Sequence, residues 1–145
     1  MKRAHGDDGT ILLLVLGFAV VLLVLVAVVA DVSAVILAKR GAASAADGAA
    51  VAAAQQLDQD AVYAHGLTEA IPLSPDLVQQ VVGTYAARAA TAQNGLTLTA
   101  ALDQAQTTAT VVATRKLRLP FTGWLSVGSV TVTAVAHAKA PFLTP

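Results

Sequence analysis

Apolar residues are concentrated at the start of the chain, whereas apolar and polar residues alternate near its end. The strongest apolar block begins at Ile11 and ends at Ala30, and its 20 residues include no charged or polar side chain. A bilayer core about 30 Å thick is crossed by about 20 apolar residues in an α-helix, which also satisfies its own backbone hydrogen bonds. The pattern therefore predicts a membrane-spanning helix over residues 11–30.

A secretory signal peptide is the competing interpretation of this block. The tripeptides that end at Ala30 and Ala34 have the residue types of a cleavage site. The apolar core of a signal peptide usually has about 7–15 residues, whereas this one has 20. A retained anchor is therefore favoured, with residues 1–10 as a short tail or leader. Two basic residues flank each end of the span, so the number of basic residues does not indicate which end lies in the cytoplasm.

An alanine-rich stretch follows and predicts that the helix continues outside the membrane, over residues 31–66. Alanine is the best helix former, and the first proline after the span is Pro72, so the helix is expected from about Thr10 to about Ala64. Alanine recurs every four residues, which makes a shallow ridge that another element can approach closely. The high alanine content alone would place some alanines at this spacing, and the ridge does not identify its partner. Its members are Ala30, Ala34, Ala38, Ala42, Ala46, Ala50 and Ala54.

Two aspartates interrupt this surface. Asp31 follows the span directly, where its carboxylate can reach the headgroups and mark the water boundary. Asp47 is either a solvated residue or a charged contact between packed subunits. The candidate residues for helix packing and assembly are Asp31, Ala34, Ala38, Ala42, Ala46, Asp47 and Ala50.

Residues 67–145 are expected to form a small α+β head. Ser74 and Pro75 have the residue types of a helix N-cap and first turn, which predicts a second helix from about Pro75 to Gln93. Alternating apolar residues then predict strands over about 96–102, 107–119 and 127–139, joined as an antiparallel meander with one face packed on a helix. A head of about 75 residues has a small core, so packing against the long helix would stabilise it.

The expected loop between the last two strands carries two aromatic residues, Phe121 and Trp124. At a hairpin tip they lie at a membrane interface, anchor a partner, or close the end of a small core. A basic run precedes them, in which Arg115 is expected on the opposite strand face from Lys116 and Arg118. This run either touches anionic headgroups or keeps an edge strand from aggregating.

Composition removes several classes of function. Charged residues make up 12% of the 145 residues, about half of the 25% that is usual in soluble domains. Nine basic residues balance nine acidic ones, which argues against nucleic-acid binding. The chain has no cysteine, and His5, His65 and His137 lie apart without partners at metal-ligand spacing. No catalytic motif occurs, so we expect no enzyme activity, cofactor or metal site.

Residues 6–58 resemble the N-terminal module of the TadE/TadG-like Flp pilus-assembly proteins. That module has a glycine before an apolar span, an aspartate at its end, a short basic cluster and an Ala-Asp-x-Ala-Ala helix. The matching residues here are Gly9, Asp31, Lys39-Arg40 and 46–50. Residues 107–140 are loosely similar to the closing strands of small TadE-like proteins.

The resemblance implies a pseudopilin or minor pilin of the tight-adherence system, with a cytoplasmic N-terminus and a pilin-like head outside the cell membrane. Its partners would be the lipid bilayer, other pilin-like subunits and the secretion platform, in a homo- or hetero-oligomer or a surface pilus. Leader processing is implied at Gly6 or Gly9, although the glutamate that the family places shortly after the glycine is absent here. The alternative is an extracytoplasmic binding module whose N-terminus serves only for targeting or anchoring.

Overall fold

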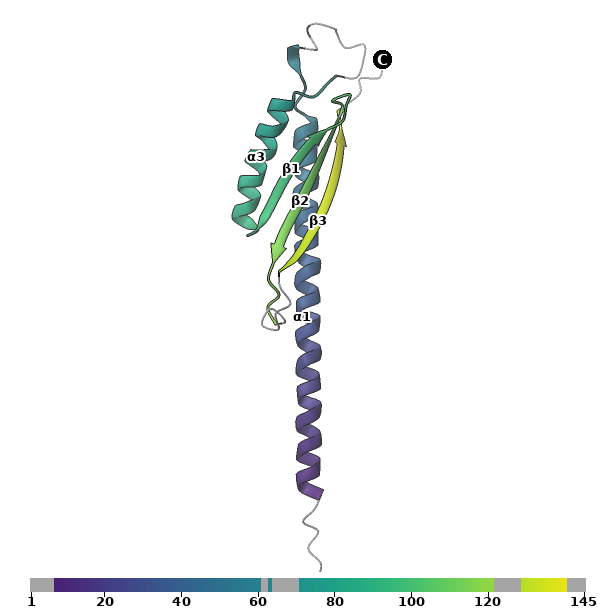
Figure 1. Cartoon of the computed structure of the whole chain (residues 1–145), viewed down its shortest axis with the longest axis vertical. Helices are drawn as coiled ribbons and strands as arrows, with labels where there is room; N and C mark the ends of the chain where they lie inside the picture. The colour runs from purple at the N-terminus through teal and green to yellow at the C-terminus, as the bar shows by residue number, and fades with distance from the viewer. Residues whose placement is uncertain (1–6, 61–62, 64–70, 122–128, 141–145) are drawn as a thin grey trace, which may run out of the picture.

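The protein is a long helix with a small head packed against its C-terminal half (Figure 1). A computed structural model describes residues 7–60, 63, 71–121 and 129–140. Their main elements are the helices α1 (Asp7–Ala54) and α3 (Pro75–Ala92) and the strands β1 (Leu96–Leu102), β2 (Thr108–Leu117) and β3 (Val130–Lys139). At 1.5 Å per residue, the 48 residues of α1 measure about 72 Å. The fold is α+β, as the sequence predicts.

Helix α1 ends ten residues before the predicted end at Ala64, so that prediction is wrong. The chain after Ala54 pairs with the segment that leads into α3. The Asp58 N–H donates to the Pro72 carbonyl oxygen at 2.9 Å, and the Ser74 N–H donates to the Gln56 carbonyl oxygen at 2.9 Å. A continuing helix would use the same backbone groups internally, so this tertiary pairing overrides the helix propensity of the local sequence.

The sheet is the predicted antiparallel meander, with strand order β1-β2-β3. Leu96 pairs with Arg115, and Leu117 pairs with Val130, which fixes the register of both hairpins. Buried and exposed residues alternate along each strand, so one face of the sheet is covered and the other faces outward. Helix α3 lies within one residue of its predicted bounds, although the Ser74 side chain makes no cap hydrogen bond.

The covered face of the sheet lies on α1, which packs against β2, β3 and α3, while α3 also packs against β1. On α1 the core residues are all small and at most 6% exposed; they are Ala42, Ala45, Ala46, Ala49, Ala50 and Ala53. The larger buried side chains come from the other elements and their connections, among them Leu73, Val78 and Val111. From Ala38 onward, the partner of the alanine ridge is therefore the head of the same chain.

Replacing Ala46 by leucine tests this packing. Ala46 is fully buried under the sheet, and additional methyl groups in a filled core typically destabilise a protein by about 1–3 kcal/mol. We expect Ala46→Leu to lower the midpoint of thermal unfolding, measured by circular dichroism of the full chain in detergent. The matched control is Val51→Leu, on the exposed side of the same helix. Equal midpoints for the two variants would contradict the packing described.

The turn between β1 and β2 is held by Asp103. Its carboxylate accepts hydrogen bonds from the Thr107 N–H at 2.7 Å, the Thr108 N–H at 3.0 Å and the Thr107 hydroxyl at 3.1 Å. These bonds favour the charged form and lower the pKa of Asp103 from its ordinary value of 3.8, the bond from the Thr108 N–H having the largest effect. The ionised carboxylate therefore stabilises the folded state above pH 3.8, and this contribution is lost as the pH falls through the lower folded-state pKa.

Substitution of Asp103 should therefore have a pH-dependent effect. We expect Asp103→Ala to lower the unfolding midpoint at pH 7, and the difference from the unsubstituted protein to shrink as the pH falls below about 4. Gln104→Ala, at the neighbouring exposed turn position, is the uncharged control. A difference for Asp103→Ala that stays constant from neutral pH to about pH 3 would contradict a role for the ionised carboxylate.

Candidate assembly and membrane surface

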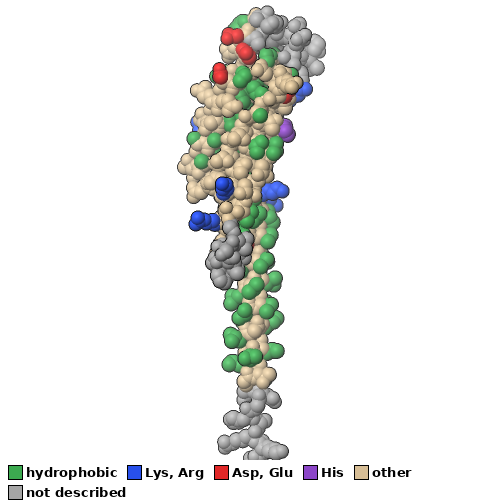
Figure 2. Space-filling model, viewed as in Figure 1, with side chains coloured by type: hydrophobic (Ala, Val, Ile, Leu, Met, Phe, Trp, Pro, Cys, Tyr) green, Lys and Arg blue, Asp and Glu red, His purple; other side chains and the backbone are tan. Residues whose placement is uncertain are grey.

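The N-terminal half of α1 forms an exposed apolar stalk, which we define as residues 11–37. Its large aliphatic and aromatic side chains are 45–74% exposed, apart from the half-buried Val35, and Figure 2 shows apolar side chains on the part of the helix that projects from the head. Among the described residues, this is the one helix long and apolar enough to cross a membrane, and none of its most apolar window is buried. A helix that is apolar all round needs lipid or other apolar surfaces around it.

Asp31 lies on this helix but does not face its surroundings. It is 5% exposed and is the one buried charged residue in the described part of the chain. Its Oδ1 accepts a hydrogen bond from the backbone N–H of Phe121 at 3.0 Å, across 90 residues of sequence. The structure thus brings together two predicted site residues, through a contact that no sequence pattern indicated.

The other predicted site residues fall into three environments. Ile11 is exposed on the stalk, while Ala30 and Ala34 are half-buried close to where the head begins. Ala38, Ala42, Ala46 and Ala50 are buried within the head, and Asp47 is exposed. Gly9 lies in α1 with open space around its Cα, whereas Gly6 and Trp124 lie outside the described residues.

The basic run divides between the two faces of β2, as predicted. Arg115 is half-buried on the covered side, and its Nη1 donates to the Gln93 Oε1 at 3.3 Å. Lys116 and Arg118 are exposed. Two further exposed cations, Lys39 and Arg40, lie on α1 directly after the stalk. The basic residues at the base of the head therefore come from two segments far apart in the sequence.

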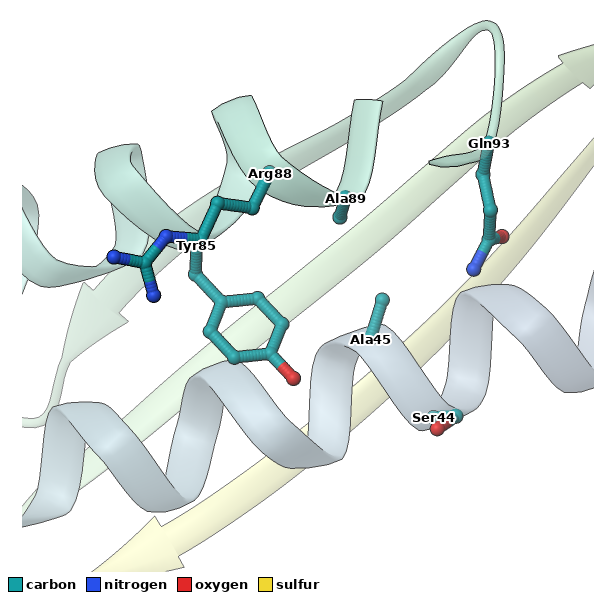
Figure 3. A pocket seen from close by; sticks show the side chains of 6 residues that line it. All are labelled: Ser44, Ala45, Tyr85, Arg88, Ala89 and Gln93. Atoms are coloured by element: carbon teal, nitrogen blue, oxygen red, sulfur yellow. The ribbon is translucent and has the colours of Figure 1, made fainter. Parts of the chain in front are cut away.

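A shallow hollow of about 330 Å³ lies between α1 and α3. Figure 3 shows the side chains that line it; they are Ser44, Ala45, Tyr85, Arg88, Ala89 and Gln93. The Gln93 Nε2 donates to the Gly41 carbonyl oxygen at 3.4 Å. The lining contains one cation and no carboxylate, so it offers no acid–base pair. In the described part of the chain, no group of His, Asp and Glu residues is arranged to hold a metal ion.

These features define a class of protein: a small α+β head built on the second half of a helix whose first half is apolar and exposed. Residues 9–56, which are 48 of the 145 residues, match the family of putative Flp pilus-assembly TadE/G-like proteins. The match covers most of α1 and confirms the resemblance of the N-terminal module. No curated protein and no solved structure matches the chain.

A charge in the middle of the stalk tests its environment. Val24 is exposed on the stalk, and an arginine at the centre of a membrane span costs about 2.5–3.5 kcal/mol on insertion scales. We expect Val24→Arg to reduce the fraction of protein that stays in membranes after a carbonate wash. The control is Val51→Arg, at an exposed position of the same helix within the head. Unchanged retention of Val24→Arg would show that the stalk does not lie in lipid.

Proposed function

We propose that the protein is a membrane-anchored pilus-assembly or minor-pilin-like structural subunit of a Flp/Tad-type system. One observation carries the proposal: the exposed apolar stalk and the alanine-faced wall of the head core are two halves of one uninterrupted helix. The family match falls on this same helix. Because one continuous helix joins the head to its anchor, the position of the head relative to the membrane is set by the stalk. A structural subunit of a pilus requires such a connection.

The proposed mechanism is non-covalent. The stalk first lies in the cell membrane, with the N-terminus in the cytoplasm and the head outside. Its side chains then exchange lipid for the apolar helices of neighbouring subunits, because the same aliphatic surface suits both environments. No covalent chemistry is needed, which agrees with the structural role of the family that matches residues 9–56.

The burial of the alanine ridge indicates where subunits would meet. Ala42, Ala46 and Ala50 are covered by the sheet of their own chain and are closed to a second subunit. Contacts between subunits in our proposal therefore use the stalk and the outer surface of the head. Ala30 and Ala34, which are half-buried near the base of the head, are the ridge members that remain partly accessible.

The mature N-terminus of the protein purified from cells separates this proposal from its alternative. An end at Asp7 or Thr10 would indicate processing after Gly6 or Gly9, as in a pilin, and an uncleaved chain would indicate an assembly factor. An end at Asp31 or Val35 would mean that a signal peptidase had removed the stalk. That last result would overturn the proposal in favour of a secreted binding module.

Photo-crosslinking in intact cells tests the assembly surface. We expect p-benzoylphenylalanine in place of Leu23, which is strongly exposed on the stalk, to give covalent adducts with other small apolar-helix subunits. The control position is Gln104, which is exposed in the turn between β1 and β2. If irradiation of the Leu23 variant gave only monomers, the proposed packing between stalks would be abandoned.

A further inference from the structure

Four exposed cations lie where the stalk meets the head, and we call them the basic collar. Lys39 and Arg40 come from α1, and Lys116 and Arg118 come from the end of β2 and the residues that follow it. Figure 2 shows basic side chains on either side of the molecule at this level, just above the apolar stalk. The collar therefore draws on two segments that meet only in the folded protein.

The hydrogen bond between Asp31 and Phe121 places the two segments at one level. Lys39 and Arg40 lie about 12–14 Å along α1 from Asp31, at 1.5 Å per residue. Arg118 and Lys116 lie at most about 10–17 Å from Phe121, at about 3.3 Å per residue of extended chain, because the chain turns at Pro120 and Phe121. The strand runs beside the helix (Figure 1), so all four cations fall within one narrow band.

The outer surface of the stalk carries no exposed charge beyond Asp31, and its one exposed hydroxyl, that of Ser33, donates to the Val29 carbonyl oxygen at 2.8 Å. Val32, Ile36 and Leu37 are all exposed, and the first exposed charges of α1 after the stalk are Lys39 and Arg40. Because the Asp31 carboxylate is buried against the Phe121 backbone, it does not interrupt this surface. The stalk of 27 residues is about 40 Å long, close to the thickness of a bilayer with its headgroups, about 40–45 Å.

Four of the described acidic residues of the head, Asp58, Asp60, Asp76 and Asp103, follow α1 in the sequence, and Figure 2 shows acidic side chains near the end of the head that is remote from the stalk. Asp47 is the exception, because it is exposed on α1, about 10 Å along the helix from Arg40. On the stalk side of the collar, Asp31 is the one acidic residue of the stalk, and it is buried. The end of the head that is continuous with the stalk therefore presents positive charge.

We propose that the basic collar binds the anionic lipid headgroups of the bilayer that the stalk crosses. This inference rests on the anchoring part of the proposed function. It places the water boundary at Lys39 and Arg40 and not at Asp31. Phe121, which is 48% exposed, lies on the lipid side of the collar, at the depth where aromatic side chains are enriched. Asp31 acts as a positioning residue that holds the backbone of Phe121 against α1.

The test uses the full chain in nanodiscs of phosphatidylcholine alone or with three parts in ten of phosphatidylglycerol. Electron spin resonance of spin-labelled lipids measures the preference of the protein for phosphatidylglycerol over phosphatidylcholine. We expect a clear preference that weakens with salt. Removing both charges in Lys116→Gln/Arg118→Gln should lower it about 25-fold, since each cation at an anionic surface contributes roughly fivefold and the two factors multiply. Lys39→Gln/Arg40→Gln is an independent second pair, expected to behave alike.

The control pair is Arg88→Gln/Lys139→Gln, which removes two exposed cations outside the collar and should leave the preference unchanged. Incorporation into discs of phosphatidylcholine alone reports on the anchor, so a failure there would count against the proposed function and not against the collar. No preference for phosphatidylglycerol, or an equal loss in the control pair, would overturn the inference. The inference would also be overturned if the collar variants kept their lipid preference but no longer gave photo-crosslinks between copies of the chain. In that case the collar would bind the acidic end of a neighbouring head and not the lipid.

Discussion

The fold depends on the packing of a β-sheet onto the alanine face of one helix. Alanine side chains contribute little apolar area, but they let the strands approach the helix closely, and the larger side chains of Leu73, Val78 and Val111 fill the space between the layers. Gly48 allows a similarly close approach by α3, because a Cβ at this position would lie 2.9 Å from the Cζ of Tyr85. The head core is therefore incomplete without the second half of α1, and stalk and head form one structural unit.

One helix thus serves two different environments, and side-chain size separates them. Along the stalk, leucine, valine and isoleucine point outward in all directions and require apolar neighbours from outside the chain. Within the head, alanines point inward and find their neighbours in the chain itself. Asp31 lies at the transition, where its hydrogen bond to Phe121 ties the head to the stalk. Burial of this carboxylate is costly unless it is bonded, so the contact fixes the position of the segment at Phe121.

Local patterns were sufficient to predict most of the fold. The periodicity of α3 and the alternation along β1, β2 and β3 are properties of consecutive residues, and the structure confirms them. The end of α1 was not predictable in this way, because the Leu57–Leu73 bridge depends on residues brought together by the fold. The alanine ridge predicted close packing but not its partner, since small residues every four positions suit a sheet as well as a helix. The contact between Asp31 and Phe121 leaves no periodic signal at all.

The basic collar lies outside the membrane in the proposed topology, although positive charges next to a span usually favour the cytoplasmic side. Its origin in two distant segments of the chain explains how both can hold. Charges close to a membrane span influence its orientation during insertion, and here the flanking pairs, Lys2 with Arg3 and Lys39 with Arg40, are balanced. Lys116 and Arg118 are more than 80 residues beyond Ala30, so they lie outside the short flanks that matter at that stage. They reach the base of the head only when β2 pairs with its neighbours and packs on α1. In the proposed arrangement, folding adds positive charge at the outer surface of the membrane after the orientation has been decided.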